Sequence, residues 1–266
     1  MNCTICGSNL TEPVFSGRIL AKYDADYFYC RECGHFQTES PFWLKEAYES
    51  ALSLIDTGII SRNTSLAAKT APILYFLFGK YHTYLDWGAG CGLFVRLMRD
   101  IGFDFRWRDQ YAKNQFARGF EYNQEKIELI TCFEVFEHLP DPLVQIDEML
   151  KIADTILFST ELYSEKNIPV KQQDWHYFAP KHGQHISFFS IRTLEYIASK
   201  KNLNFVSNNR NLHLFSRRPL KHKIILRFLL SAHRLILIPI NEYVCRKMKS
   251  KTFTDSGLSG KNTEIN

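Results

Sequence analysis

The sequence lacks the segments that identify several classes of protein. Its first residues, Met1–Cys6, contain neither a basic start nor an apolar run, so no secretory leader is predicted. The Gly-Lys-Ser/Thr ending of a phosphate-binding P-loop is absent, and no internal repeat is visible. Charged residues interrupt the apolar C-terminal region every few positions, which argues against a transmembrane span.

A surplus of one charge is also missing from most of the chain. Residues 1–216 contain 22 Lys or Arg and 25 Asp or Glu, a balance of −3, whereas residues 217–266 contain 11 and 3, a balance of +8. Because the basic residues are concentrated in the tail, a nucleic-acid substrate is not expected. A chain of 266 residues, 45% hydrophobic and 23% charged, can hold one α/β domain with appendages.

Cysteine is plentiful, with seven residues, and four of them form two C-x2-C pairs: Cys3, Cys6, Cys30 and Cys33. A glycine follows each pair, Gly7 and Gly34, as in a turn whose N–H groups face metal-bound sulfur. The spacing predicts a structural four-thiolate zinc site in a small zinc-ribbon module, residues 1–40. This composition favours metal over disulfides and therefore a reducing cytoplasm. His35 is an alternative ligand, but four sulfurs are the simpler set.

The motif around which the chain is organised is the stretch Tyr84–Val95. An apolar run that carries Asp86 leads into three glycines at alternate positions and then into an amphipathic segment, which predicts a strand, a tight turn and a helix. Glycines are needed where φ is positive or where a ligand lies against the backbone. The turn is expected to direct N–H groups at a ligand. A dinucleotide fingerprint, G-x-G-x-x-G, would place the third glycine one residue later.

Alternating β and α patterns from residue 82 to 216 predict a mostly parallel, doubly wound sheet. Strands are expected at 83–87, 105–108, 127–133, 155–159, 205–207 and 213–215, and helices at 93–101, 143–151 and 191–200. Asp109 ends the second strand, where an acid can bind both ribose hydroxyls of a nucleoside. Glu134 and His138 follow the strand at 127–133, at the edge of the sheet where open parallel sheets bind ligands.

These motifs resemble those of the class I S-adenosylmethionine-dependent methyltransferases. Asp86 to Gly92 reads D-x-G-x-G-x-G, like motif I; Asp109 is similar to motif II, and residues 134–138, EVFEH, resemble the EVxEH of motif IV. The resemblance implies a Rossmann-like, seven-stranded sheet in residues 82–216. It also implies S-adenosylmethionine as cofactor, bound by Asp86, Gly88, Ala89, Gly90, Gly92, Asp109 and Glu134.

With its cysteine module the chain resembles, more narrowly, zinc-containing methyltransferases of sugar and polysaccharide biosynthesis clusters. Residues 185–190, HISFFS, resemble the HxSxFS segment of nucleotide-sugar C-methyltransferases, whose histidine is a proposed base. The resemblance implies a sugar-type small-molecule substrate and a base at His185, with His182 and Glu134 as further candidates. His185 could instead fix its loop, and His138 the start of the next helix. The chain departs from these enzymes in lacking a second large domain and in having His182 where they have tyrosine.

The remaining segments are expected to frame this domain. Residues 41–81 are predicted to form a helical lid, with helices over 42–55 and 66–78 and a junction in which Arg62 either reaches the cofactor or is exposed. Phe116 and Phe120, in an irregular stretch, are expected near the adenine. The long connection 161–188 is rich in aromatic residues, which favours a substrate-covering loop over disorder.

The tail has a different character. Residues 217–249 predict a basic amphipathic helical segment with a polar stripe of Lys223, Arg227, Ser231 and Arg234, and residues 250–266 are expected to be disordered. Such a helix suits peripheral contact with an anionic membrane through residues 220–240, or equally packing on the core or on a second subunit. Two other functions fit less well, a zinc-ribbon ribosomal RNA methyltransferase and a non-catalytic, cofactor-binding scaffold.

Overall fold

The computed structural model describes residues 1–48 and 57–259, which divide into two compact units. The first unit comprises residues 1–48, 133–151 and 158–219, and the second comprises residues 57–132, 152–157 and 220–259. This division differs from the expected segments 1–40, 41–81, 82–216 and 217–249, because stretches far apart in sequence share one core. Each unit is described below by itself.

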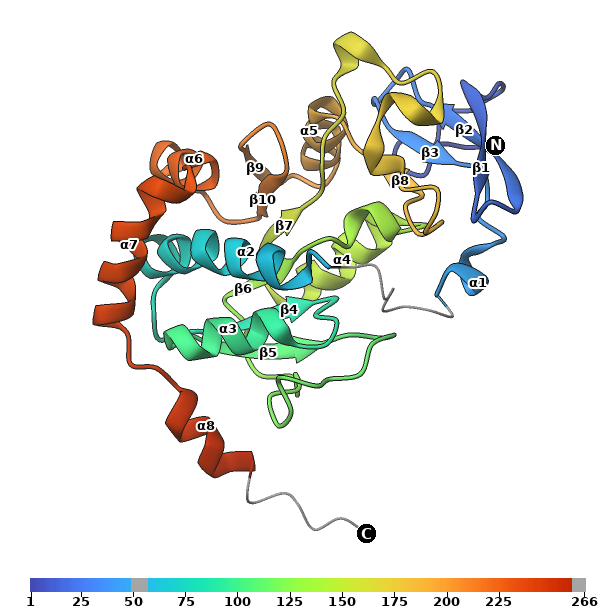
Figure 1. The fold of residues 1–266 in the computed structure, drawn as a ribbon. Coiled ribbons are helices and arrows are strands. Elements are labelled where there is room, and N and C mark those ends of the chain that lie inside the picture. Colours follow the sequence, from blue (N-terminus) through green and yellow to red (C-terminus); the bar gives the residue numbers. More distant parts are fainter. Residues whose placement is uncertain (49–56, 260–266) are drawn as a thin grey trace. The chain divides into compact units, whose positions relative to one another are not determined.

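The second unit is built on parallel strands. Strand β4 (Thr83–Trp87) pairs in parallel with β5 (Asp104–Arg108) and with β6 (Leu129–Cys132) (Figure 1). Helix α3 (Leu93–Ile101) connects β4 to β5 and buries its apolar face, as the amphipathic pattern predicts. Helix α2 (Ile59–Ile73) packs against α3 and continues as the π-helical turn η1 (Leu74–Phe78) after an internal proline, Pro72. The expected strand–helix alternation is confirmed here.

The described residues form a six-stranded sheet in the order β5-β4-β6-β7-β10-β9, so the α/β class is confirmed but the seven strands are not. Strand β7 spans Thr155–Ser159, and β9 (Asn204–Ser207) and β10 (Leu212–Ser216) form an antiparallel pair. Beyond the edge strand β5 there is a single parallel bridge, between Trp107 and Glu121. The 12 residues between Arg108 and Glu121 form only turns and bends. This stretch contains no helix, the usual crossover between parallel strands, and the pairing that follows it is limited to the one bridge.

The first unit has its own antiparallel sheet in the order β1-β2-β3-β8 (Figure 1). Its strands are β1 (Phe15–Ile19), β2 (Tyr23–Tyr29), β3 (Phe36–Thr38) and β8 (Ser187–Phe188). Because β8 pairs with β3, the cysteine module is not closed at residue 40. Aromatic rings from the connection 161–188 complete its core, among them Tyr163, Tyr177, Phe178 and Phe188. The expected substrate-covering loop is therefore largely core material, which explains its aromatic content.

Short helices complete the first unit. Helix α1 (Leu44–Tyr48) follows Trp43, which is buried and donates its indole N–H to the carbonyl of Gly183 at 2.8 Å. Residues 43–48 therefore belong to this core and not to a separate lid; Ala51, Leu54 and Ile55, expected on the same helix, lie outside the described residues. The other elements are η2 (Phe136–His138), α4 (Pro142–Ile152), η3 (Glu165–Asn167), η4 (Gln172–Asp174), η5 (His176–Phe178) and α5 (Ile191–Lys200).

The ends of α4 and α5 follow the sequence signals. Helix α4 begins at Pro142, one residue before the predicted start, and Asp141 caps it by accepting the N–H of Val144 at 3.2 Å. Ser190 caps α5 by accepting the N–H of Thr193 at 3.2 Å.

The tail forms three helices in the second unit: α6 (Lys223–Ser231), α7 (Arg234–Lys247) and α8 (Thr252–Ser259). Helices α6 and α7 pack against α2, where Asn241 donates to the carbonyl of Ala68 at 2.8 Å. Helical structure at 252–259 corrects the expectation of disorder from residue 250. The reason is Asp255, which is buried and accepts two bonds from Arg99 at 2.8 and 2.9 Å. Residues 260–266 lie outside the described part.

Among the described residues, no single helix is long and apolar enough to cross a membrane. Helices α6 and α7 pass that test only as a pair, on length and composition, with a bend of 113° between them.

Candidate functional site

The glycine loop after β4 has the backbone that its sequence predicts. Gly88, Gly90 and Gly92 have φ values of 70°, 54° and 86°, in the left-handed region that side chains other than glycine rarely adopt. A methyl group added at Gly90 would meet nothing within 4 Å, so this face of the loop is open. At Gly92 it would come within 2.9 Å of Asn114 and 3.0 Å of Ala117. The need for positive φ is confirmed at all three positions.

The N–H groups of this loop are bonded to the chain itself. Gly88 and Ala89 donate to the carbonyl of Arg108 at 3.0 and 3.1 Å, and Gly92 donates to that of Ala89 at 2.9 Å. Gly90 donates to the carboxylate of Asp109 at 2.8 Å. The expectation that the loop directs these N–H groups at a ligand is therefore wrong for the four residues. A loop that offers open space in place of N–H donors suits a ligand without a pyrophosphate.

Asp86 is buried, with an exposed fraction of 4%, and accepts the hydroxyl of Thr131 from the neighbouring strand β6 at 2.6 Å. Burial, opposed by the hydrogen bond from Thr131 and helped by the negative charge of Asp109, raises the pKa of Asp86 to about 7. The side chain therefore links β4 to β6 beneath the loop. Thr131 gave no signal in the sequence, because its role depends on which strands are neighbours.

Asp109 holds the glycine loop in place. Besides Gly90, its carboxylate accepts the N–H groups of Tyr111 and Ala112, each at 2.7 Å. A carboxylate has about four acceptor positions, so about one remains for a ribose hydroxyl. Trp107 supports the same loop, since its indole N–H donates to the carbonyl of Gly90 at 2.9 Å. Trp107 is a further loop-positioning residue that sequence reasoning missed.

Two expected wall residues have different surroundings. Phe120 is buried, with the guanidinium carbon of Arg99 3.6 Å from its ring centroid, and its proximity to the adenine stays a prediction. Phe116 is 49% exposed, and its proximity to the adenine stays a prediction. Arg62 is exposed in the first turns of α2, not at a junction between two helices.

In the first unit, Glu134 lies directly after Phe133 in a strained conformation, with φ at 55°. Its N–H donates to the hydroxyl of Ser159 at 2.8 Å, and that hydroxyl donates to the Glu134 carboxylate at 2.6 Å. This reciprocal pair fixes a half-buried carboxylate at the end of β7. Non-glycine residues with positive φ concentrate at functional sites, which marks Glu134 as more than a surface acid.

Next to it the structure brings together three ligand-type side chains: Glu137, His138 and His185. Their ligand atoms all lie within 4.8 Å of one another, although His185 is far away in sequence. Backbone pairing produces this proximity, because the N–H of Ile186 donates to the carbonyl of Glu137 at 2.8 Å. The two imidazole rings are nearly perpendicular, with centroids 4.8 Å apart. Glu137 is part of the predicted EVFEH string but was not singled out as a site residue.

The carboxylate of Glu137 is fully buried, and the rings of His138 and His185 are half-buried. Loss of hydration and the nearby His185 together lower the pKa of His138 to about 3, so His138 is neutral at physiological pH. Burial raises the pKa of Tyr177 well above its usual value, and the charges of Glu137 and Glu134 add to the effect. His182, by contrast, is exposed in a turn and does not belong to the cluster.

A model of the methyltransferase-domain family matches residues 60–208, which is more than half of the chain and includes the glycine loop and the EVFEH string. The chain belongs to the methyltransferase-domain family. No curated protein sequence matches it.

Solved structures similar to this methyltransferase domain share little sequence with it. The mitomycin 7-O-methyltransferase MmcR is 13% identical, with 66% of this chain and 60% of that chain covered and a TM-score of 0.47. TnmH is 13% identical, with 67% and 62% covered and a TM-score of 0.48. The plantazolicin methyltransferase BpumL, solved with S-adenosylhomocysteine, is 12% identical, with 65% and 94% covered and a TM-score of 0.41. The chain spans less than two thirds of MmcR and TnmH, and similarity this low says nothing about its acceptor.

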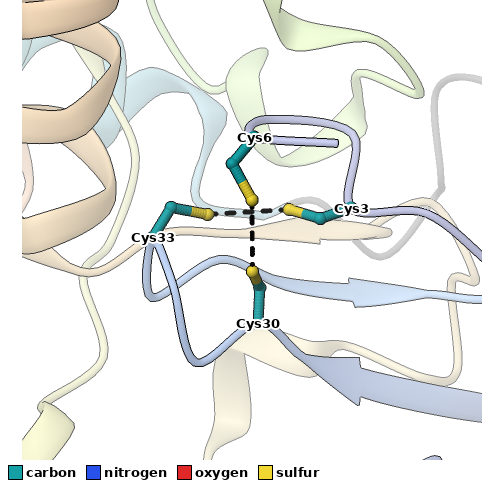
Figure 2. Close-up of side chains that lie close together, drawn as sticks. All are labelled: Cys3, Cys6, Cys30 and Cys33. Carbon is teal, nitrogen blue, oxygen red and sulfur yellow. Dashed lines mark hydrogen bonds between the residues drawn. The ribbon is translucent and has the colours of Figure 1, made fainter. Parts of the chain in front are cut away.

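The methyltransferase chain has a second site in its N-terminal module, where four thiols converge (Figure 2). The sulfur atoms of Cys3 and Cys33 are 3.6 Å apart and those of Cys6 and Cys30 are 3.4 Å apart. A disulfide would require about 2.05 Å, whereas tetrahedral zinc with Zn–S distances of about 2.3 Å places its sulfurs roughly 3.8 Å apart. The spacing therefore fits four ligands of one metal ion.

The two turns that carry these cysteines have the same geometry. Gly7 donates to the carbonyl of Cys3 at 2.9 Å, and Gly34 donates to that of Cys30 at 2.8 Å. Both glycines have positive φ, 84° and 70°. The hydrogen bond between Cys3 and Cys33 lowers the pKa of Cys3 and raises that of Cys33, as when two thiols share one proton. Burial also raises the pKa of Cys30, so all four thiolates would be favoured only by a bound cation. His35, the alternative ligand, is fully buried and does not belong to this cluster.

Proposed function

We propose that the chain transfers the methyl group of S-adenosylmethionine to a small-molecule acceptor, a nucleotide-linked or lipid-linked sugar of surface polysaccharide biosynthesis. The observation that carries the proposal is the glycine loop of the methyltransferase domain, with three positive φ values and an open face at Gly90. S-adenosylmethionine supplies a methyl group already activated on a sulfonium, so the protein has only to position the donor and prepare the acceptor.

Donor binding is assigned to the residues around the loop. Gly90 leaves room for the cofactor, while Gly88, Ala89 and Gly92 shape the turn through their own hydrogen bonds. Asp86 acts from beneath the loop through its bond to Thr131, and Asp109 offers its remaining acceptor position to the ribose. Glu134 is a proposed cofactor-binding residue through the resemblance of residues 134–138 to motif IV.

Acceptor activation is assigned to the polar cluster of the first unit. A sugar hydroxyl, or a carbon next to a carbonyl group, must lose a proton to accept a methyl cation equivalent. The Nδ1–H of His185 donates to the carbonyl of Tyr177 at 2.6 Å, which leaves Nε2 as a proton acceptor. His185 is therefore the first candidate for the base, followed by Glu134 and the exposed His182.

The cysteine cluster is assigned a structural role. Cys3, Cys6, Cys30 and Cys33 would hold one zinc ion in a closed shell, which leaves no position for substrate. The ion would stabilise a module whose sheet needs a strand from residues 187–188 to be complete. Zinc is thus proposed to support the fold on which His185 depends.

The tail is proposed to touch an anionic membrane through residues 220–240. Exposed apolar side chains line α6 and α7, namely Ile224, Ile225, Phe228, Leu235, Ile236 and Ile238, and the tail carries the excess of basic residues. Sedimentation with vesicles tests this proposal: binding should require anionic lipid and fall with salt, and equal binding to neutral vesicles would contradict it.

A methyl-transfer assay tests the function. Protein with its cysteine site filled is incubated with donor labelled in the methyl group and with nucleotide sugars, lipid-linked sugars or total RNA. Label should appear in a sugar acceptor, and the His185→Ala variant should lose turnover while its affinity for S-adenosylhomocysteine stays near that of wild type. Transfer of label to RNA, or to no acceptor while the cofactor binds, would overturn the assignment.

A further inference from the structure

We propose that Glu137, His138 and His185 form a binding site for a divalent first-row transition-metal ion, separate from the four-cysteine cluster. Two imidazoles and a carboxylate suit Zn²⁺, Fe²⁺ or Mn²⁺. Their ligand atoms lie within 4.8 Å of one another, and all three residues belong to the first unit. The proposal depends on which ligand atom of each side chain remains available to a metal ion once its hydrogen bonds are made.

Both histidines have their ring orientation and tautomer fixed by backbone carbonyls. The Nδ1 atom of His138 lies 3.1 Å from the carbonyl of Gln184, and that of His185 lies 2.6 Å from the carbonyl of Tyr177. A carbonyl can only accept, so each Nδ1 carries the proton and each Nε2 carries a free lone pair. Histidines that ligate metal characteristically donate their other ring N–H to a carbonyl or carboxylate in this way.

Glu137 supplies the third ligand. Its side chain is fully buried, and its carboxylate faces the hydroxyl of Tyr177 without a well-formed hydrogen bond. The charge of Glu137 helps to raise the pKa of Tyr177 well above its usual value. A buried carboxylate with so little compensation is costly, and a cation between it and the two imidazoles would balance its charge.

The spacing of the three donors requires only a small adjustment. Zinc–nitrogen distances of about 2.0–2.1 Å place neighbouring ligand atoms roughly 3.4 Å apart in a tetrahedral shell. Donors already within 4.8 Å reach that spacing through side-chain rotation. The backbone that carries them is tied down, because Ile186 donates to the carbonyl of Glu137 and the hydroxyl of Ser187 donates to that of Leu139 at 2.7 Å.

Three protein ligands leave open coordination positions, unlike the closed shell of four cysteines. Because His138 and His185 are only half-buried, a further ligand can reach the ion from their side. The role of the ion rests on the proposed function: an open position would hold an oxygen of the acceptor and lower the pKa of that hydroxyl. With the ion bound, the Nε2 atom of His185 would be a ligand and could not take the proton, so the proton of the acidified hydroxyl would pass to solvent water on the half-buried side of the site.

Metal stoichiometry tests the site. Wild type and variants are equilibrated with excess Zn²⁺, separated from unbound ion by gel filtration and measured by elemental analysis. Wild type should hold one more Zn²⁺ ion per chain than either the Glu137→Gln or the His185→Ala variant. This difference does not depend on how far the cysteine cluster is filled, because all three proteins have the same cysteines. His182→Ala removes an exposed histidine of the same loop and should keep the wild-type count. Equal counts in wild type and both site variants would overturn the proposal.

Thermal stability of the Glu137→Gln variant gives an independent readout. Without added ion its Tm should exceed that of wild type, because an uncompensated buried charge is gone, and added Zn²⁺ should raise the Tm of wild type more than that of the variant. If this variant does not fold, His185→Ala serves in the count. Calorimetry with S-adenosylhomocysteine on the same samples separates the two proposals, since loss of the ion should leave cofactor affinity unchanged. An equal Zn²⁺-induced rise in wild type and both variants would contradict the site.

Discussion

The polar groups of the candidate sites are bonded differently in the two units. In the second unit, Asp86 is bonded to Thr131, Asp109 accepts three N–H groups, and Arg99 is paired with Asp255. In the first unit, the four sulfur atoms of the cysteine cluster converge on one another, and the buried carboxylate of Glu137 converges with the rings of His138 and His185.

The difference indicates where external ligands are needed. Polar side chains whose hydrogen-bond partners belong to the chain itself set the shape of the glycine loop and anchor the tail, so their role is structural. Polar side chains that converge without such partners are expected to bind an ion or a substrate, because a buried polar group without a partner lowers stability. The second unit is accordingly assigned to a cofactor that fits an open backbone, and the first unit to metals and the acceptor.

The largest expected effect comes from removing the metal of the cysteine cluster. Cys3→Ser should unfold the first unit even in zinc-supplemented buffer, because a structural site of this kind contributes folding free energy directly. Circular dichroism and thermal unfolding measure the change, and Cys245→Ser, at an exposed cysteine outside the cluster, should behave as wild type. A cooperative, wild-type melt of Cys3→Ser would show that the thiols need no ion.

A smaller but still large effect should come from the pH dependence of Asp86. Its pKa is about 7 in the folded state against 3.8 for an ordinary aspartate, so the folded state binds the proton more tightly. This contribution to stability is therefore fully present below about pH 4 and is lost as pH rises through about 7. Its size is about 4 kcal/mol, at ~1.4 kcal/mol per pKa unit.

Asp86→Asn keeps an oxygen that accepts from Thr131 but cannot ionise. Urea unfolding from pH 5 to 8 should therefore show a flatter profile for the variant, and a higher free energy of unfolding than wild type at pH 8. Parallel profiles for the two proteins would contradict the buried, proton-binding role of this acid.

Breaking the buried ion pair between Arg99 and Asp255 in the second unit should lower the free energy of unfolding by somewhat less. Asp255→Ala leaves the buried Arg99 with Asp104 as its remaining acid and frees α8, at an expected cost of about 3 kcal/mol in the free energy of unfolding. Phe253→Ala, on the same helix at a position 88% exposed, should cost under about 0.5 kcal/mol. Equal urea midpoints for the two variants would mean that α8 is not anchored through this pair.

The smallest expected change in stability comes from two glycine substitutions, which distinguish the loss of space for the cofactor from the strain of a positive φ. Gly90 and Gly119 both have positive φ, 54° and 83°, and a methyl group at either would meet nothing within 4 Å. Substitution to alanine should cost each about 1 kcal/mol of stability. Only Gly90→Ala should weaken binding of S-adenosylhomocysteine, by tenfold or more, as measured by calorimetry. Equal affinity in the two variants would contradict cofactor binding at the open face of the loop.

Local features were predictable from the sequence. The bounds of β4, α3, β7 and α5 agree with the periodic patterns, and the glycines at 88, 90 and 92 adopt positive φ as their spacing requires. These signals lie within a few residues of the structure they specify, so no knowledge of the rest of the fold was needed.

What could not be predicted depends on contacts between distant segments. The pairing of β8 with β3 and the capture of Asp255 by Arg99 each join residues more than 140 positions apart. The position of His185 beside Glu137, and the partners of Thr131 and Trp107, likewise appear only when the strands are in place. The aromatic residues of 161–188 had the composition of a binding loop but pack in a core.

Calorimetric titration of S-adenosylhomocysteine into the folded, metal-replete protein tests the central claim most directly. The account predicts saturable binding of one molecule per chain, with the same affinity in wild type and in His185→Ala. Absence of heat with both S-adenosylmethionine and S-adenosylhomocysteine would contradict the account and would leave a metal-stabilised binding protein in its place.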